Sequence, residues 1–280
     1  MYQYSILASD EALLTQIKEW KERGVGSVAM DFEGEFNLHV YGEHLCLIQL
    51  YDGDRFFLAD PFLLSKEALE QFFTDKSLEK VMFACEGDAS LVRKCYGIQL
   101  EGVWDVRVPA LALGYTGNLS GLMDRYHLEH PLENKKKNQM TNWMRRPLDP
   151  HQIQYALGDV AQLLALKPLL MAEVAEKKLT KQVMAAMKHC AEAKHPERPG
   201  WTKLPGYRFM DPKTQAYAKA FYQARDKVAQ KRNLPVSRVL DKHVVADLAR
   251  KAANHEQIDF DSVSRDGVLV RALHEALESV

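Results

Sequence analysis

Four acidic side chains, in or beside apolar segments, constrain the fold of this chain more than any other feature. Asp31 and Glu33 come at the end of one such segment, Asp88 follows another, and Asp159 lies four residues after Tyr155 in a third. A lone buried carboxylate is so costly that it normally becomes protonated or finds a cation. A fold that gathers the four carboxylates would therefore offer a site for divalent metal, and two-metal sites commonly cleave phosphodiesters.

The spacing of these residues suits a shared site. Alternate residues of a strand project from one face, so Asp31 and Glu33 should point the same way. Positions four apart are neighbours on a helix, which pairs Tyr155 with Asp159. Asp88 lies just beyond a predicted strand, where a helix begins. If the strands are adjacent, the four carboxylates meet at one edge of the sheet, and an all-oxygen ligand set favours Mg²⁺ or Mn²⁺.

Hydrophobic periodicity predicts an α/β fold with a mixed sheet flanked by helices. Strands are expected at residues 27–32, 45–51, 56–59, 80–84 and 103–105, and helices at 10–21, 66–74, 88–96 and 106–114. Asp52-Gly53-Asp54 provides a turn, so the second and third strands should form a hairpin. Asp149-Pro150 is a typical helix start and precedes the helix that carries Tyr155.

Prolines and glycines between residues 195 and 206 divide the chain. We expect a catalytic domain over residues 1–195, a linker over 196–210 and a helical domain over 211–280. Residues 201–280 hold 14 Lys+Arg against 10 Asp+Glu, a net of +4, which leaves 23 against 28, or −5, for residues 1–200. A modestly basic helical part suits nucleic-acid binding, although such an excess is also common on solvated helices.

Several classes of protein are disfavoured. The four cysteines show no C-x-x-C or zinc-ligand spacing, which favours reduced thiols. The N-terminus lacks a secretory pattern, and no run approaches the length of a membrane helix, so we expect a soluble cytoplasmic protein. Neither a G-x-S-x-G motif nor a phosphate-binding glycine loop is present.

The joint pattern resembles the DEDD 3′–5′ exonucleases of the tyrosine subclass, and within them the ribonuclease D family. The resemblance covers residues 25–165 and rests on the acids, on Tyr155 and on three further stretches: 47–53, 142–148 and 154–160. One departure is the sequence Phe83-Ala84-Cys85 before the second acid, where the family often has His-Ala. The helical tail, around residues 225–250, resembles a single HRDC domain, the module attached to ribonuclease D and RecQ-type helicases.

The resemblance implies a ribonuclease H-like sheet and five catalytic residues that work with two divalent ions, Mg²⁺ or Mn²⁺. Asp31, Glu33 and Asp159 would hold the ion that carries the attacking hydroxide, and Asp31 with Asp88 would hold the other. Tyr155 would orient the attacking water, because a phenol with a pKa of about 10 is a poor base at neutral pH.

The implied activity is trimming of single-stranded 3′ ends of structured RNA, such as tRNA precursors, with release of nucleoside 5′-monophosphates. Two alternatives stay open at this point. One is a 3′–5′ exodeoxyribonuclease of DNA repair, since the acidic motif does not recognise the 2′-hydroxyl. The other is a non-catalytic scaffold that binds nucleic acid, although a pure binder has no need to cluster like charges.

Basic, amide and aromatic residues outside the acidic motif are candidate substrate contacts, because they can pair with phosphates or stack on unstacked bases. They are Phe32, Lys137, Gln139, Asn142, Trp143 and Arg146. The alternatives are a core position for Phe32 and a solvated surface for the lysine run that ends at Lys137.

Two acids also have ordinary structural explanations. Asp88 alone would more often be a helix cap than a ligand. Asp105 could be a fifth acid of the site, but it fits better as the cap of a helix that begins after it.

Overall fold

The computed structural model describes residues 1–129, 140–193 and 198–280, and the chain divides into two compact units. The first unit comprises Met1–Glu35 and Glu43–Lys194, and the second comprises Phe36–Gly42 and His195–Val280. In the described ranges, no helix combines the length and the apolar character needed to cross a membrane.

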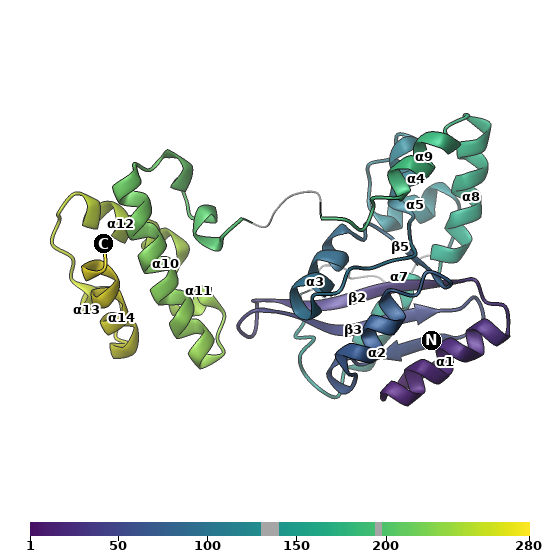
Figure 1. Cartoon of the computed structure of the whole chain (residues 1–280), viewed down its shortest axis with the longest axis horizontal. Coiled ribbons are helices and arrows are strands. Elements are labelled where there is room, and N and C mark those ends of the chain that lie inside the picture. The colour runs from purple at the N-terminus through teal and green to yellow at the C-terminus, as the bar shows by residue number, and fades with distance from the viewer. Residues whose placement is uncertain (130–139, 194–197) are drawn as a thin grey trace. The chain divides into compact units, whose positions relative to one another are not determined.

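A mixed sheet forms the centre of the first unit, as the sequence predicts, and it has six strands (Figure 1). Its order is β1-β4-β3-β2-β5-β6, with parallel pairs β1–β4, β2–β5 and β5–β6 and an antiparallel pair β3–β4. The predicted hairpin is confirmed, since Tyr51 pairs with Phe56 across the turn. The strands are β1 (Tyr4–Leu7), β2 (Ser27–Phe36), β3 (Glu43–Tyr51), β4 (Phe56–Ala59), β5 (Glu79–Met82) and β6 (Val103–Asp105).

Two strands differ from the sequence-based expectation. The edge strand β1 was not predicted, because its alternation is short and three of its four residues are exposed. Strand β2 does not end at the first acid: it continues to Phe36, so Asp31 and Glu33 lie inside a strand.

The five predicted helices of the first unit are present, and the structure adds others. The helices are α1 (Asp10–Glu22), α2 (Lys66–Phe73), α3 (Glu86–Tyr96), α4 (Arg107–Ala112), α5 (Leu119–Arg125), α7 (Pro150–Val160), α8 (Leu163–Glu176) and α9 (Thr180–Met187). Those predicted are α1, α2, α3, α4 and α7, and those added are α5, α8 and α9. Trp20 of α1 and Phe72 of α2 are buried in a large cluster with Val28 and Met30 of β2. A smaller cluster joins α7 to β3 and β4 and includes Leu47, Leu58 and Tyr155.

The turn between β3 and β4 is fixed by the carboxylate of Asp52, which is buried. One oxygen accepts from the backbone N–H groups of Asp54 (3.0 Å) and Arg55 (2.7 Å). The other accepts from the indole N–H of Trp20 (2.9 Å) and from Arg23 (3.1 Å). One carboxylate therefore joins the hairpin to α1.

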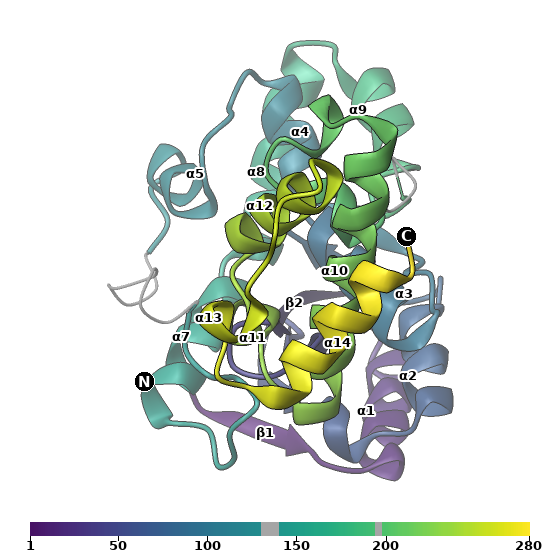
Figure 2. The same ribbon diagram turned by 90° about the vertical axis from the view of Figure 1, so that its left-hand side faces the viewer.

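The second unit is helical, with a core of its own. It contains α10 (Pro212–Arg232), α11 (Val236–Val239), α12 (Lys242–Ala253), α13 (Phe260–Val263) and α14 (Gly267–Glu278). Helix α10 packs against both α12 and α14 (Figure 2), and Phe221, Leu248 and Leu273 are buried between them. Part of the expected linker is structured: 3₁₀ turns cover Gly200–Lys203 and Tyr207–Phe209, and Leu204 lies in this core.

We predict that Asp52→Ala lowers the free energy of unfolding by about 3 kcal/mol, because it leaves buried donors without an acceptor. Burial raises the pKa of Asp52, but the N–H groups of Arg55 and Asp54 and the indole outweigh it, so the pKa lies below its ordinary value. The stabilisation is therefore present above the unfolded pKa, about 3.9, and is lost as pH falls through the folded pKa.

Urea denaturation at pH 7 and pH 3 measures this effect. The difference in the free energy of unfolding between wild type and Asp52→Ala should be large at pH 7 and smaller at pH 3. Asp54→Ala is the matched control, since that side chain is exposed and lies 3.8 Å from Arg23. If both variants lose the same free energy of unfolding at pH 7, the stabilising role assigned to the Asp52 carboxylate is wrong.

Candidate active site

The four predicted acids come from three elements: β2, α3 and α7. Asp31 and Glu33 occupy alternate positions of β2, which lies beside β5 in parallel register. Helix α3 follows β5 and carries Asp88 in its first turn, while α7 carries Asp159. Because parallel strands present their carboxyl ends at one edge, the chain emerging from β5 brings Asp88 toward the acids of β2.

The four acids lie close enough together for the charges of three of them to act on Glu33. Glu33 is only 8% exposed. Burial raises its pKa well above the ordinary value, and the negative charges of Asp31, Asp159 and Asp88 raise it further. Within the described ranges, no three Asp, Glu, His or Cys side chains have the spacing of a formed metal site.

The donor set fits a hard divalent cation. All four groups are carboxylates, which suit Mg²⁺ and Mn²⁺ better than zinc or copper. A buried cluster of like charges is unfavourable by itself, and a divalent ion would relieve the repulsion that acts on Glu33. The chemistry of these side chains therefore suits a hard divalent cation.

Tyr155 lies beside Asp159, as the four-residue spacing predicts. Its pKa is raised by burial, by the charges of Asp159 and Glu33, and by a hydrogen bond with Asp159. The phenol is therefore neutral throughout the physiological pH range. A neutral hydroxyl held by a carboxylate can orient a water molecule, but it is not a base.

Helix α7 is fixed at its start in the way the sequence predicts. Asp149 accepts from the N–H of His151 (2.8 Å), and the side chain of Gln152 accepts from the N–H of Asp149 (2.9 Å), which completes a capping box. Gln154 also binds the backbone of Tyr2 with both its oxygen (2.6 Å) and its nitrogen (3.0 Å). These bonds set the orientation from which Tyr155 reaches the acids.

Asp88 does not have the capping role that a lone aspartate at this place would usually have. The N-cap of α3 is Cys85, which makes no side-chain capping bond, and Asp88 lies in the first turn. Burial and then the charge of Asp105 raise the pKa of Asp88 to about 7.

The structure corrects the expected substrate contacts at two aromatic residues. Phe32 is 7% exposed and packs edge-on against Phe73, because the even positions of β2 face α2. Trp143 is 1% exposed, and its ring lies 6.5 Å from that of Tyr155. Neither ring has a free face on which a base could stack, and Trp143 instead supports the phenol.

Two of the polar candidates make hydrogen bonds within the first unit. Arg146 forms a bidentate pair with Asp60 (2.6 and 3.0 Å) and donates to the carbonyls of Cys46 and Trp143, and its side chain stays partly exposed. Asn142 accepts from the N–H of Met144 (3.0 Å) and is half-buried. The predicted contacts at Lys137 and Gln139 lie outside the described residues.

Two further buried acids were not fully recognised from the sequence. Glu35 is almost completely buried on β2, at the next position on the face of Asp31 and Glu33. The alternation Asp31-x-Glu33-x-Glu35 is the sequence signal that would have found it. Asp105 does bind the N–H of Arg107 at the start of α4 (2.8 Å), in line with a cap, but it also binds the turn before α3.

Comparisons with known proteins agree with this architecture. Residues 4–175 match the family model described as 3′–5′ exonuclease. Ribonuclease D of Nitrobacter hamburgensis is 32% identical over 214 residues, which cover 73% of this chain and 54% of that protein. The chain spans about half the length of the curated relatives it matches.

Solved structures show the same fold. Escherichia coli RNase D, described as an exoribonuclease involved in structured RNA processing, superimposes with a TM-score of 0.74 at 21% identity, covering 98% of this chain and 75% of that one. The catalytic core of RRP6 from Trypanosoma brucei (mutant C496S) gives 0.78 at 16% identity, covering 99% and 79%.

We predict that Glu33→Gln stabilises the metal-free protein by about 1–2 kcal/mol at pH 8, because it removes a buried charge from among like charges. The pKa of Glu33 is raised in the folded state. Wild-type stability should therefore fall as pH rises from the unfolded pKa, about 4.3, to the folded pKa, whereas the variant lacks this loss.

Thermal denaturation in a chelator at pH 5 and pH 8 tests this prediction. The advantage of Glu33→Gln should be larger at pH 8. Glu22→Gln is the control, because Glu22 is an exposed residue of α1. A variant that is less stable than wild type at pH 8 would show that the acids do not repel one another.

Proposed function

The chain belongs to the 3′–5′ exonuclease family, and on that premise we propose that it is a metal-dependent exoribonuclease of the ribonuclease D type. It removes nucleotides one at a time from single-stranded 3′ ends of structured RNA and releases nucleoside 5′-monophosphates. The observation that carries the proposal is the convergence of Asp31, Glu33, Asp88 and Asp159 from three elements, with Tyr155 beside them.

Each acid has a distinct role in the proposal. Asp31, Glu33 and Asp159 would hold one divalent ion, and Asp31 with Asp88 would hold a second. When bound, such ions lower the pKa of water and neutralise the charge that grows on the phosphate and on the leaving 3′ oxygen. Alternate positions of one strand present Asp31 and Glu33 on the same face, while α3 and α7 carry the other two acids.

Tyr155 positions the attacking water. Its hydrogen bond with Asp159 fixes the hydroxyl, and packing against Trp143 fixes the ring. Because the raised pKa keeps the phenol protonated, Tyr155 accepts no proton from the water and contributes orientation alone.

RNA is the proposed substrate because the curated relatives that match the chain are ribonucleases D. The second unit, which resembles an HRDC domain in sequence, is proposed to bind the body of the nucleic acid. Residues 201–280 carry an excess of four positive charges, which favours contact with phosphates.

We predict that the protein converts a 5′-labelled RNA with a single-stranded 3′ tail into a ladder that shortens from the 3′ end, only when Mg²⁺ or Mn²⁺ is present. Asp31→Asn and Asp159→Asn should lower kcat about a thousandfold, because each removes a metal ligand. Denaturing gels with and without a chelator provide the measurement. Internal cleavage products, or cleavage in the chelator, would refute the proposal. Faster degradation of a matched DNA oligomer would indicate a deoxyribonuclease instead. Tight binding of RNA without turnover would indicate a non-catalytic scaffold.

We predict that Tyr155→Phe lowers kcat about a hundredfold and leaves KM within a few-fold, since the hydroxyl contributes to orienting the nucleophile rather than to binding RNA. Steady-state rates on a short RNA oligomer measure both constants. The rate of wild type relative to the variant should not depend on pH between 6 and 9, because the phenol stays protonated there. A ratio that grows tenfold per pH unit would instead assign Tyr155 as a base.

A further inference from the structure

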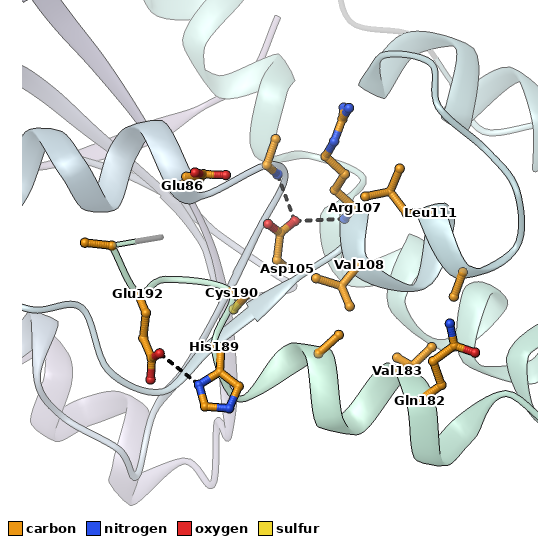
Figure 3. Close-up of a pocket in the computed structure, with 14 residues that line it drawn as sticks. Glu86, Asp105, Arg107, Val108, Leu111, Gln182, Val183, His189, Cys190 and Glu192 are labelled. Carbon is orange, nitrogen blue, oxygen red and sulfur yellow. Dashed lines mark hydrogen bonds and ion pairs between the residues drawn. The ribbon is translucent and has the colours of Figure 1, made fainter. Parts of the chain in front are cut away.

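We propose that Asp105 is a positioning residue that sets the place of Asp88 by holding the turn between β5 and α3. One oxygen of Asp105 accepts from the N–H of Ala84 (2.8 Å) and the other from the N–H of Cys85 (3.0 Å). The first oxygen also accepts from the N–H of Arg107 (2.8 Å), so one carboxylate joins two helix starts (Figure 3). This inference rests on the proposed function of Asp88.

The turn needs an external anchor. Ala84 adopts a left-handed conformation (φ 58°), which is unfavourable for a residue with a Cβ atom and persists where the surroundings impose it. Cys85 is the N-cap of α3 but provides no side-chain acceptor. The carboxylate of Asp105 therefore supplies the acceptor that the local sequence lacks.

The sheet places Asp105 where it can do this. Asp105 pairs with Met82, the last residue of β5, and the N–H of Val106 donates to the carbonyl of Met82 (2.8 Å). The carboxylate thus starts beside the end of β5 and reaches the N–H groups of Ala84 and Cys85, the second and third residues beyond the strand. Helix α3 begins at Glu86, so a shift of the turn would move Asp88, which lies in the first helical turn.

Asp105 does not serve as a fifth ligand in this proposal. It is buried, and both of its oxygens already accept from backbone N–H groups. A carboxylate that orients a ligand-bearing segment acts on metal affinity through geometry, and losing such an outer contact commonly costs about 10- to 100-fold in affinity or activity.

The chain contains a matched control in Asp52. That carboxylate is also buried and also accepts from two backbone N–H groups of a turn, but its turn joins β3 to β4 and carries none of the four acids. Asp105→Ala and Asp52→Ala therefore remove the same kind of interaction from two turns. A structural role alone predicts the same outcome for both.

The test compares wild type, Asp105→Ala, Asp105→Asn and Asp52→Ala by urea denaturation in a chelator, by calorimetric Mn²⁺ titration, and by kcat and KM on labelled RNA. We expect Asp105→Ala to weaken Mn²⁺ binding and lower kcat by about 10- to 100-fold with KM within about threefold. Asp105→Asn keeps the oxygen that accepts from Ala84 and Arg107. Its Mn²⁺ affinity and kcat should lie between those of Asp105→Ala and wild type. Asp52→Ala should lose stability only.

The outcomes separate the two proposals. If wild type binds no Mn²⁺ or degrades no RNA, the proposed function fails. If wild type is active and neither Asp105 variant loses more Mn²⁺ affinity than Asp52→Ala, the positioning role fails. Should Asp105→Ala not fold, Asp105→Asn gives the same comparison, because it retains two of the three hydrogen bonds.

Discussion

Mutual repulsion among four carboxylates is the constraint on which the first unit depends. Burial and three neighbouring acids already raise the pKa of Glu33 in the metal-free protein. Such a cluster does not form from local preference, because every member is more stable apart. The sheet and its two helices must impose it, and the stabilising contacts are placed accordingly. The cluster between α7 and β3 and the large core beneath α1 and α2 flank the strand that carries the acids.

The positions of the acids depend most on the turns that lead into the helices. A strand has little freedom in direction, but the residue after it can turn several ways, and Asp88 follows such a turn. The capping box of α7 and the carboxylate on Ala84 and Cys85 address the same problem at two helix starts. In both cases a side chain satisfies backbone N–H groups that would otherwise leave the helix free to shift.

The sequence predicted the sheet, the hairpin and the helix start at Asp149 because their signals are local: alternation, a glycine turn and a cap with proline. It could not predict which face of β2 would meet α2, so Phe32 was expected near substrate although it lies in the core. The burial of Trp143 depends on distant segments in the same way. The bidentate pair of Arg146 with Asp60 also joins distant segments, and a substrate contact at Arg146 stays a prediction. The acids and Tyr155 were assigned from motif spacing, and their catalytic roles stay proposals.

Asp52 and Asp105 make the same kind of hydrogen bonds, but their roles differ. Both are buried aspartates whose oxygens accept from consecutive N–H groups of a turn, and both contribute to folding through those bonds. They differ in what the turn carries: one joins two strands of a hairpin, and the other leads into the helix that presents Asp88. Where a ligand must be held against the repulsion of its neighbours, an anchor of this kind acts on the site as well as on stability. The same bonds elsewhere in the chain act on stability alone.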